Sequence, residues 1–98
     1  MDELVVLGKV LSDINRVRII ALLKREKELC VCEICDTLGL SQPLVSRHLK
    51  QMRKAELVQT KQNGKWKVYS LRDLPIINFL FNKIEGEALP KLISCSFL

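Results

Sequence analysis

Three cysteines occur within six residues of this chain, in the run Cys30-Val31-Cys32-Glu33-Ile34-Cys35. Thiolates bind soft metal ions and are also the form of cysteine that is oxidised. In a helix, at about 100° per residue, Cys32 and Cys35 lie about 60° apart, whereas Cys30 lies about 200° from Cys32. Three sulfurs can therefore meet at one ion only if Cys30 precedes the helix or the first turn distorts. The spacing predicts a site whose occupation changes the start of that helix.

A set of three sulfurs suits a trivalent ion such as As(III) or Sb(III), which bonds three thiolates in a pyramid. Zinc prefers four ligands, so Glu33, His48 or the distant Cys95 would have to supply the fourth. Cd(II), Pb(II) and Cu(I) also suit thiolate sites. Three other interpretations remain open: the cysteines are small buried hydrophobic residues, a structural zinc site, or a redox pair at Cys32 and Cys35. No nucleophile–base pair and no paired carboxylates occur in an apolar setting, so we expect no enzymatic activity.

Residues 31–55, which include two of the cysteines, are predicted to form a helix-turn-helix. The first helix ends before Gly39, where a left-handed conformation is easiest. Ser41 is the expected N-cap of the second helix, and Pro43 falls in the first turn, where no backbone N–H is needed. Two helices joined by a short turn of this kind are typical of DNA-binding proteins.

Residues 57–71 are predicted to form a basic β-hairpin directly after the recognition helix, which is the position of a wing. The pair Asn63-Gly64 separates two alternating runs, and such a pair favours a tight turn with both residues at positive φ. We expect Trp66 to pack at the base of this wing.

Two further helices are predicted to flank this unit, at residues 1–11 and 74–89. Both carry apolar side chains over a wide arc, which favours a homodimer interface, although both could instead close the core of one protomer. Between residues 11 and 31, a helix from about Ile14 to Arg25 begins after Ser12 or Asp13 as its N-cap.

The chain of 98 residues is long enough for one domain, 1–98, with an aliphatic core, since 48% of residues are hydrophobic and only 5% aromatic. Its net charge is +5, but residues 41–72 hold eight basic side chains and one acid, a net +7. Such a basic segment predicts a polyanion partner, here double-stranded DNA. No apolar run is long enough to cross a membrane and the N-terminus lacks a signal peptide, so we expect no membrane partner and a cytoplasmic location.

The N-terminal part of a recognition helix normally enters the major groove, and the wing meets the neighbouring backbone. Arg47 fits guanine and Gln42 fits adenine, whereas the lysines suit phosphates. His48 falls among core positions, so a packed histidine is an alternative to a base reader. The candidate DNA-binding residues are Ser41, Gln42, Ser46, Arg47, His48, Lys50, Arg53, Lys61 and Lys65.

The chain resembles the ArsR/SmtB family of metal-sensing repressors, and its arsenic-responsive branch in particular. The resemblance covers about Leu11 to Leu71, and its most specific parts are the cysteine run and Ser41-Gln42-Pro43-Leu44-Val45-Ser46-Arg47-His48-Leu49. It implies a mostly α winged helix-turn-helix homodimer that binds a palindromic operator. It also implies release when As(III) or Sb(III) binds Cys30, Cys32 and Cys35.

Other branches of the family bind zinc between terminal helices through His and carboxylate ligands. The segment 74–89 contains acids but no His, which speaks against a site of that type. The alternatives are the same repressor sensing a divalent soft metal (Cd, Pb or Zn) or thiol oxidation, and, from another class, a zinc-stabilised interaction domain.

Overall fold

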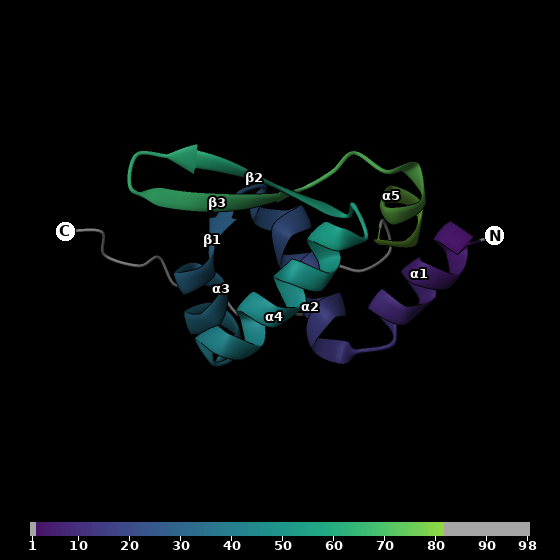
Figure 1. Ribbon diagram of the computed structural model, residues 1–98, viewed down its shortest axis with the longest axis horizontal. Coiled ribbons are helices and arrows are strands. Elements are labelled where there is room, and N and C mark those ends of the chain that lie inside the picture. Colours follow the sequence, from purple (N-terminus) through teal and green to yellow (C-terminus); the bar gives the residue numbers. More distant parts are fainter. Residues whose placement is uncertain (1, 82–98) are drawn as a thin grey trace.

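The predicted helix-turn-helix and wing are both present in the computed structural model of the protein, which describes residues 2–81 (Figure 1). Helices α3 and α4 form the helix-turn-helix and the β2–β3 hairpin forms the wing, so the predicted winged helix-turn-helix fold is confirmed. No helix within this range is long and apolar enough to span a membrane. The elements are α1 (Asp2–Leu11), α2 (Ile14–Glu26), β1 (Leu29–Cys30), α3 (Val31–Leu38), α4 (Gln42–Lys54), β2 (Val58–Asn63), β3 (Trp66–Leu71) and α5 (Pro75–Phe81).

Local signals in the sequence set the ends of these helices. Asp13 is the N-cap of α2, where its side chain accepts a hydrogen bond from the Asn15 N–H at 2.8 Å. Ser41 caps α4 and accepts from the Leu44 N–H at 3.4 Å. Gly39 ends α3 with a φ of 67°, a left-handed conformation that is costly for residues with a Cβ. The turn between α3 and α4 is therefore fixed by Gly39 and Ser41.

The wing belongs to a three-stranded antiparallel sheet in the order β1-β3-β2. In strand β1, Leu29 pairs with Tyr69 and Cys30 pairs with Val68. This strand was not predicted from the sequence, because two residues are too few to show an alternating pattern. Since β1 runs directly into α3, the middle strand of the sheet is bonded to the chain at the start of α3.

The turn at the tip of the wing differs in register from the prediction. Asn63 pairs with Trp66, so the two turn residues are Gly64 and Lys65 and not Asn63 and Gly64. Only Gly64 of these has a positive φ, 61°, which suits a hairpin turn with glycine at its first central position. Trp66 consequently lies at the tip, where it is 39% exposed, and the expectation that it packs at the base of the wing was wrong.

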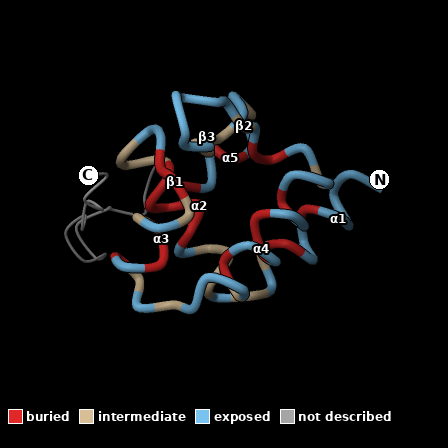
Figure 2. The backbone as a smooth tube through the Cα atoms, turned by 60° about the vertical axis from the view of Figure 1, so that its left-hand side comes forward, coloured by how far each residue is buried: buried red, intermediate tan, exposed pale blue. Residues whose placement is uncertain are grey.

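The core lies where α2 meets α3, α4 and the sheet, as the buried segments in Figure 2 show. It is aliphatic, as the composition predicted. Residues 19–23 of α2 are all buried, so the middle of this helix is enclosed by the other elements. The fully buried side chains are Ile19, Ile20, Leu22, Leu23, Leu29, Ile34, Val45, Leu49, Met52, Val58 and Ile77.

Helices α1 and α5 leave much of their apolar surface exposed. They lie at the same end of the molecule (Figure 1), where Val6 and Ile76 line a groove of about 410 Å³. Residues 82–89 of the predicted terminal helix, and Cys95, fall outside the described residues. An exposed apolar patch of this kind marks an interaction surface. The large exposed apolar side chains of the two helices are Leu4, Val5, Val6, Ile76, Phe79 and Leu80.

Candidate functional site

Cys30 lies in the chain that leads into the cysteine-bearing helix, which is one of the two arrangements that the spacing allowed. It is the N-cap residue of α3, with extended φ and ψ of −87° and 166°. Its backbone N–H donates to Glu33 Oε1 at 3.1 Å, which is half of a capping box. The side chain is buried, with 3% exposed. Burial raises the pKa of the Cys30 thiol, while a hydrogen bond from the Glu33 backbone opposes the shift, so the thiol is protonated at neutral pH.

Cys35 lies on the buried side of α3, with 9% of its surface exposed. Burial raises the pKa of the Cys35 thiol, and the charges of Asp36 and Cys30 raise it further. These two cysteines form the buried half of the candidate site, and both are protonated at neutral pH.

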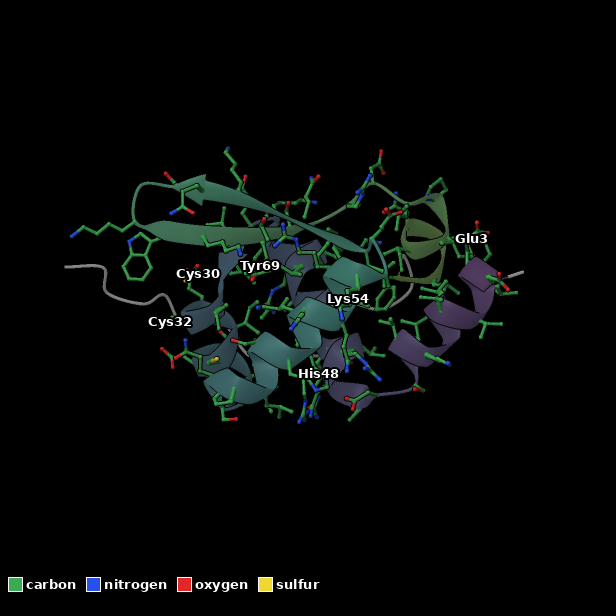
Figure 3. The ribbon with its side chains drawn as sticks, in the orientation of Figure 1. Glu3, Cys30, Cys32, His48, Lys54 and Tyr69 are labelled. Carbon is green, nitrogen blue, oxygen red and sulfur yellow. The ribbon has the colours of Figure 1, made fainter. Side chains whose placement is uncertain are left out.

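Cys32 lies in the first turn of α3, is exposed and is disulfide-bonded in this structure, so it can bind an ion only after reduction. Its Sγ lies 3.6 Å from Asp36 Oδ2, one turn further along the helix. Figure 3 shows Cys30 and Cys32 at the start of α3, and His48 in a different part of the molecule. Within residues 2–81, no group of three or more His, Cys, Asp or Glu side chains is arranged to hold a metal ion. The cysteines are thus close in the chain, but they differ in exposure and would have to converge to act together.

The recognition helix α4 presents a polar and basic face. The exposed side chains on this helix include Gln42, Ser46, Arg47, Lys50 and Arg53. The exposed residues therefore include most of those predicted to contact DNA from this helix. Ser41 is exposed as well, but its hydroxyl oxygen serves as the helix cap.

The wing carries the second group of candidate DNA contacts. Lys61 and Lys65 are exposed on β2 and in the turn. Lys67 is exposed as well, and its Nζ lies 5.9 Å from the centre of the Tyr69 ring. A cation over an aromatic face in this way is held in place by the ring quadrupole. The three lysines give the hairpin a basic surface in addition to that of α4.

His48 differs from the other candidate DNA contacts because it is buried, with 4% exposed. Its Nε2 lies 4.0 Å from Asp13 Oδ1, and neither ring nitrogen has a hydrogen-bond partner in the structure. Burial lowers the pKa of His48, while the Asp13 carboxylate partly restores it and Arg16 and Arg47 lower it further. This position fits the packed alternative better than a role in base reading.

Arg16 was not predicted to form part of a site. Its guanidinium donates to the backbone carbonyls of Lys9 and Val10 at the end of α1 and to the Gln51 side chain on α4. No sequence pattern marks this contact, since Arg16 and Gln51 are 35 residues apart. The capping partner of Cys30 was also missed, although Glu three residues after an N-cap is a recognisable signal.

A helix-turn-helix followed by a hairpin wing, with a basic exposed face on the second helix, defines a winged helix-turn-helix DNA-binding protein. Residues 13–60 match the family model described as "Bacterial regulatory protein, arsR family". The structure of HlyU from Vibrio cholerae is similar, with a TM-score of 0.74 and 30% identity over 85% of this chain and 92% of that chain. The chain belongs to the ArsR family.

Two curated relatives are named for resistance to different elements. The chain is 48% identical over 63 residues to the arsenic resistance transcriptional regulator ArsR1 of Pseudomonas putida, which covers 64% of this chain and 49% of that protein. It is 36% identical over 72 residues to the cadmium resistance transcriptional regulatory protein CadC of Listeria innocua, which covers 74% of this chain and 60% of that protein. The chain thus spans about half to three fifths of the length of these relatives.

Proposed function

We propose that this protein is a cytoplasmic transcriptional repressor that binds operator DNA as a homodimer. We further propose that it leaves the operator when As(III) or Sb(III) binds Cys30, Cys32 and Cys35. The observation that carries the proposal is the place of these cysteines at the start of α3, because α3 packs directly against the recognition helix α4. A change at the cysteines would therefore act one helix away from the DNA.

The basic surface of α4 and the wing supports the DNA-binding part of this proposal. Arg47 would bond the O6 and N7 of guanine, and Gln42 the N6 and N7 of adenine. Ser46 would add a base contact. Contacts to phosphates give affinity that falls with salt but carry no sequence information. We assign these contacts to Ser41, Lys50, Arg53, Lys61 and Lys65.

The apolar surface of α1 and α5 supports the homodimer. Leu4 and Phe79 are 64% and 76% exposed, which is unusual for large apolar side chains that serve no contact. A two-fold dimer would cover this surface and place two copies of α4 on one side of the DNA, which matches a palindromic operator.

The three thiols fit a soft ion. Because they are protonated before binding, the pH dependence of binding distinguishes a metalloid from a metal cation. Arsenite is the neutral acid As(OH)₃ near neutral pH, so replacing its three hydroxyl groups by three protonated thiols releases three waters and no net proton. A divalent cation such as Cd(II) instead displaces protons, so its binding weakens as the pH falls. Because burial keeps Cys30 and Cys35 protonated, this difference is measurable near pH 7.

The separated cysteines also supply a route for the response. Cys32 is exposed while Cys30 and Cys35 are buried, so binding one ion with all three requires the start of α3 to change shape. Inverting operator occupancy from nearly full to nearly empty takes roughly 5 kcal/mol of differential binding, whereas a single pair of coupled sites supplies about 1–3 kcal/mol. Two cysteine sites in one dimer would make up the difference.

A second candidate function is the same repressor responding to a soft divalent ion or to thiol oxidation. The similarity to the CadC regulator, whose name refers to cadmium, favours the divalent ion. Thiolate sites bind both As(III) and Cd(II), so the donor atoms alone do not distinguish between the two inducers.

The test is a DNA-binding titration of the reduced protein. A palindromic site would first be selected from a random double-stranded library, and its release followed by fluorescence anisotropy with arsenite, Cd(II) and Zn(II) in separate titrations. We expect stoichiometric arsenite to release the DNA, with an effect independent of pH between about 6.5 and 7.5. Release by cadmium alone would support the second candidate. Selection of no specific site would refute the repressor and leave an interaction domain.

Cys32→Ser tests the cysteine site in the same titration of the reduced protein, because Cys32 is exposed and its replacement leaves the core unchanged. The variant should bind DNA like the wild type and fail to respond to arsenite. A folded variant that loses DNA affinity without any arsenite would instead show that the cysteines maintain the structure.

A further inference from the structure

Arg16 connects the first helix to the recognition helix. It lies in the first turn of α2, where its Nε donates to the Val10 carbonyl at 2.9 Å and its Nη2 donates to the Lys9 carbonyl at 3.0 Å. On its other side, Nη1 donates to Gln51 Oε1 on α4. One half-buried side chain thus joins α1, α2 and α4.

The contact with α1 is made where that helix most needs a partner. The last carbonyls of a helix have no intrahelical donor, and a cation near them also favours the negative end of the helix dipole. Lys9 O has a second donor, the Ser12 hydroxyl at 2.6 Å. Since α1 buries only Leu7 and Val10, the bonds from Arg16 make up a large part of what fixes its direction.

The contact with α4 lies on the face that would meet the DNA. Gln51 follows Arg47 by one helical turn, so the two residues share one side of the helix. The planar guanidinium holds several acceptors in a fixed geometry, which a flexible ammonium group does not. The orientation of α1 relative to Arg47 is thereby set by one rigid group.

We propose that Arg16 is a positioning residue for operator recognition. It holds the dimerisation helix α1 at a fixed angle to α4, and so it sets the distance and orientation between the two recognition helices of the dimer. This proposal rests on the proposed function, since it requires a DNA-binding dimer formed through α1. Half-sites in such operators are about 34 Å apart, one turn of DNA, so a change in the angle of α1 moves both α4 helices out of register with the groove.

The experiment compares Arg16→Met, Arg16→Lys and Gln51→Ala with Arg18→Met. Arg18 is exposed on the same helix, and within residues 2–81 it forms no hydrogen bond or ion pair with α1 or α4, so its replacement removes the same charge without breaking a bond between these helices. Each variant would be titrated with the selected palindrome, with a single half-site and with palindromes lengthened or shortened by one base pair. Thermal denaturation and sedimentation would report folding and dimer formation.

We expect Arg16→Met and Arg16→Lys to lose tenfold or more in affinity for the palindrome. Their affinity for a half-site should fall no further than that of Arg18→Met, and their preference among the three spacings should weaken. Gln51→Ala, a surface change that leaves the core intact, should weaken the spacing preference in the same direction. If Arg16→Lys binds the palindrome as weakly as Arg16→Met, the role of Arg16 is to position α1 and not to attract phosphate by its charge.

Two results would overturn the proposal. One is full recovery in Arg16→Lys, which would mean that only the positive charge matters. The other is an unchanged spacing preference in both the Arg16 variants and Gln51→Ala. If the wild type itself selects no palindrome, the proposed function fails and this inference fails with it. If the wild type shows a sharp spacing preference, the proposed function stands, and the variants then test the role of Arg16 alone.

Discussion

Replacing Cys30 by serine should abolish the response to arsenite without harming the fold. Cys30 is the N-cap of α3, and serine is among the preferred residues there because its oxygen accepts a hydrogen bond from the first turn. A good N-cap contributes about 0.5–2 kcal/mol. A buried hydroxyl without a partner costs about 1–3 kcal/mol, but the Glu33 N–H offers one at this position. Because the Cys30 side chain already accepts from the Glu33 N–H, serine keeps this bond, and the free energy of unfolding should change by less than about 1 kcal/mol.

The other two cysteines provide the comparison, because the structure gives each a different environment. Cys32→Ser is an exposed change and should fall within about 0.5 kcal/mol of the wild type. Cys35→Ser places a hydroxyl inside the helix on its buried side, where it can only bond a carbonyl one turn back, and it should cost about 1–2 kcal/mol. The expected order of stability is therefore Cys32→Ser and Cys30→Ser near the wild type, with Cys35→Ser below them.

Urea unfolding under reducing conditions measures this order, and anisotropy on the selected DNA measures the response. All three variants should bind DNA, and all three should stay bound when arsenite is added. A loss of more than about 2 kcal/mol in Cys30→Ser would refute the argument that serine serves as the cap. Normal release of Cys30→Ser by stoichiometric arsenite would refute the three-sulfur site, since two cysteines would then suffice.

Three further predictions concern other parts of the molecule. Arg47→Ala should lower affinity for the selected DNA by about 1–3 kcal/mol, while non-specific affinity falls less; an equal loss on both, as expected for Lys50→Ala, would contradict base reading. Burial lowers the pKa of His48, so the unfolded state binds a proton first and the protein should lose stability as the pH falls below about 6.5, by at most about 1.4 kcal/mol per pH unit. Urea midpoints at about pH 7.5 and 5.5 measure this loss, which should be absent in His48→Gln. Gly39→Ala should destabilise by about 1–2 kcal/mol, because φ is +67° and a Cβ there meets no atom within 4 Å, so the cost is one of backbone conformation alone; a neutral result in thermal denaturation would show that the turn adapts.

The parts of the fold that could be predicted from the sequence are those with a local signal. Gly39 and Ser41 mark the turn of the helix-turn-helix through their own backbone preferences, and the cap of α2 was narrowed to two neighbouring residues, of which Asp13 is the one used. The wing followed from two alternating runs with Asn-Gly between them. The register of the wing could not be predicted, because Gly64 is compatible with either of two turn positions. The pairing along the two strands decides between these positions.

The features that escaped prediction depend on contacts between distant residues. Strand β1 exists only because β3 lies beside it, and the link from Arg16 to Gln51 joins residues on different helices. Helical geometry allowed the position of Cys30 ahead of its helix as one of two ways in which three sulfurs could meet at one ion. The difference in exposure between Cys32 and Cys35 could not be predicted, since it depends on which face of α3 meets the core.

The pairing of Cys30 with Val68 has a mechanical consequence for α4 and the wing, the two elements that we propose to contact DNA. Cys30 is both the last residue of β1 and the cap of α3, so its backbone belongs to the sheet and to the helix start at once. A displacement of this residue would act on β3, the middle strand of the sheet and one of the two strands of the wing, as well as on α3, which packs against α4. The wing and the recognition helix therefore share one hinge, and neither can be moved through Cys30 without the other.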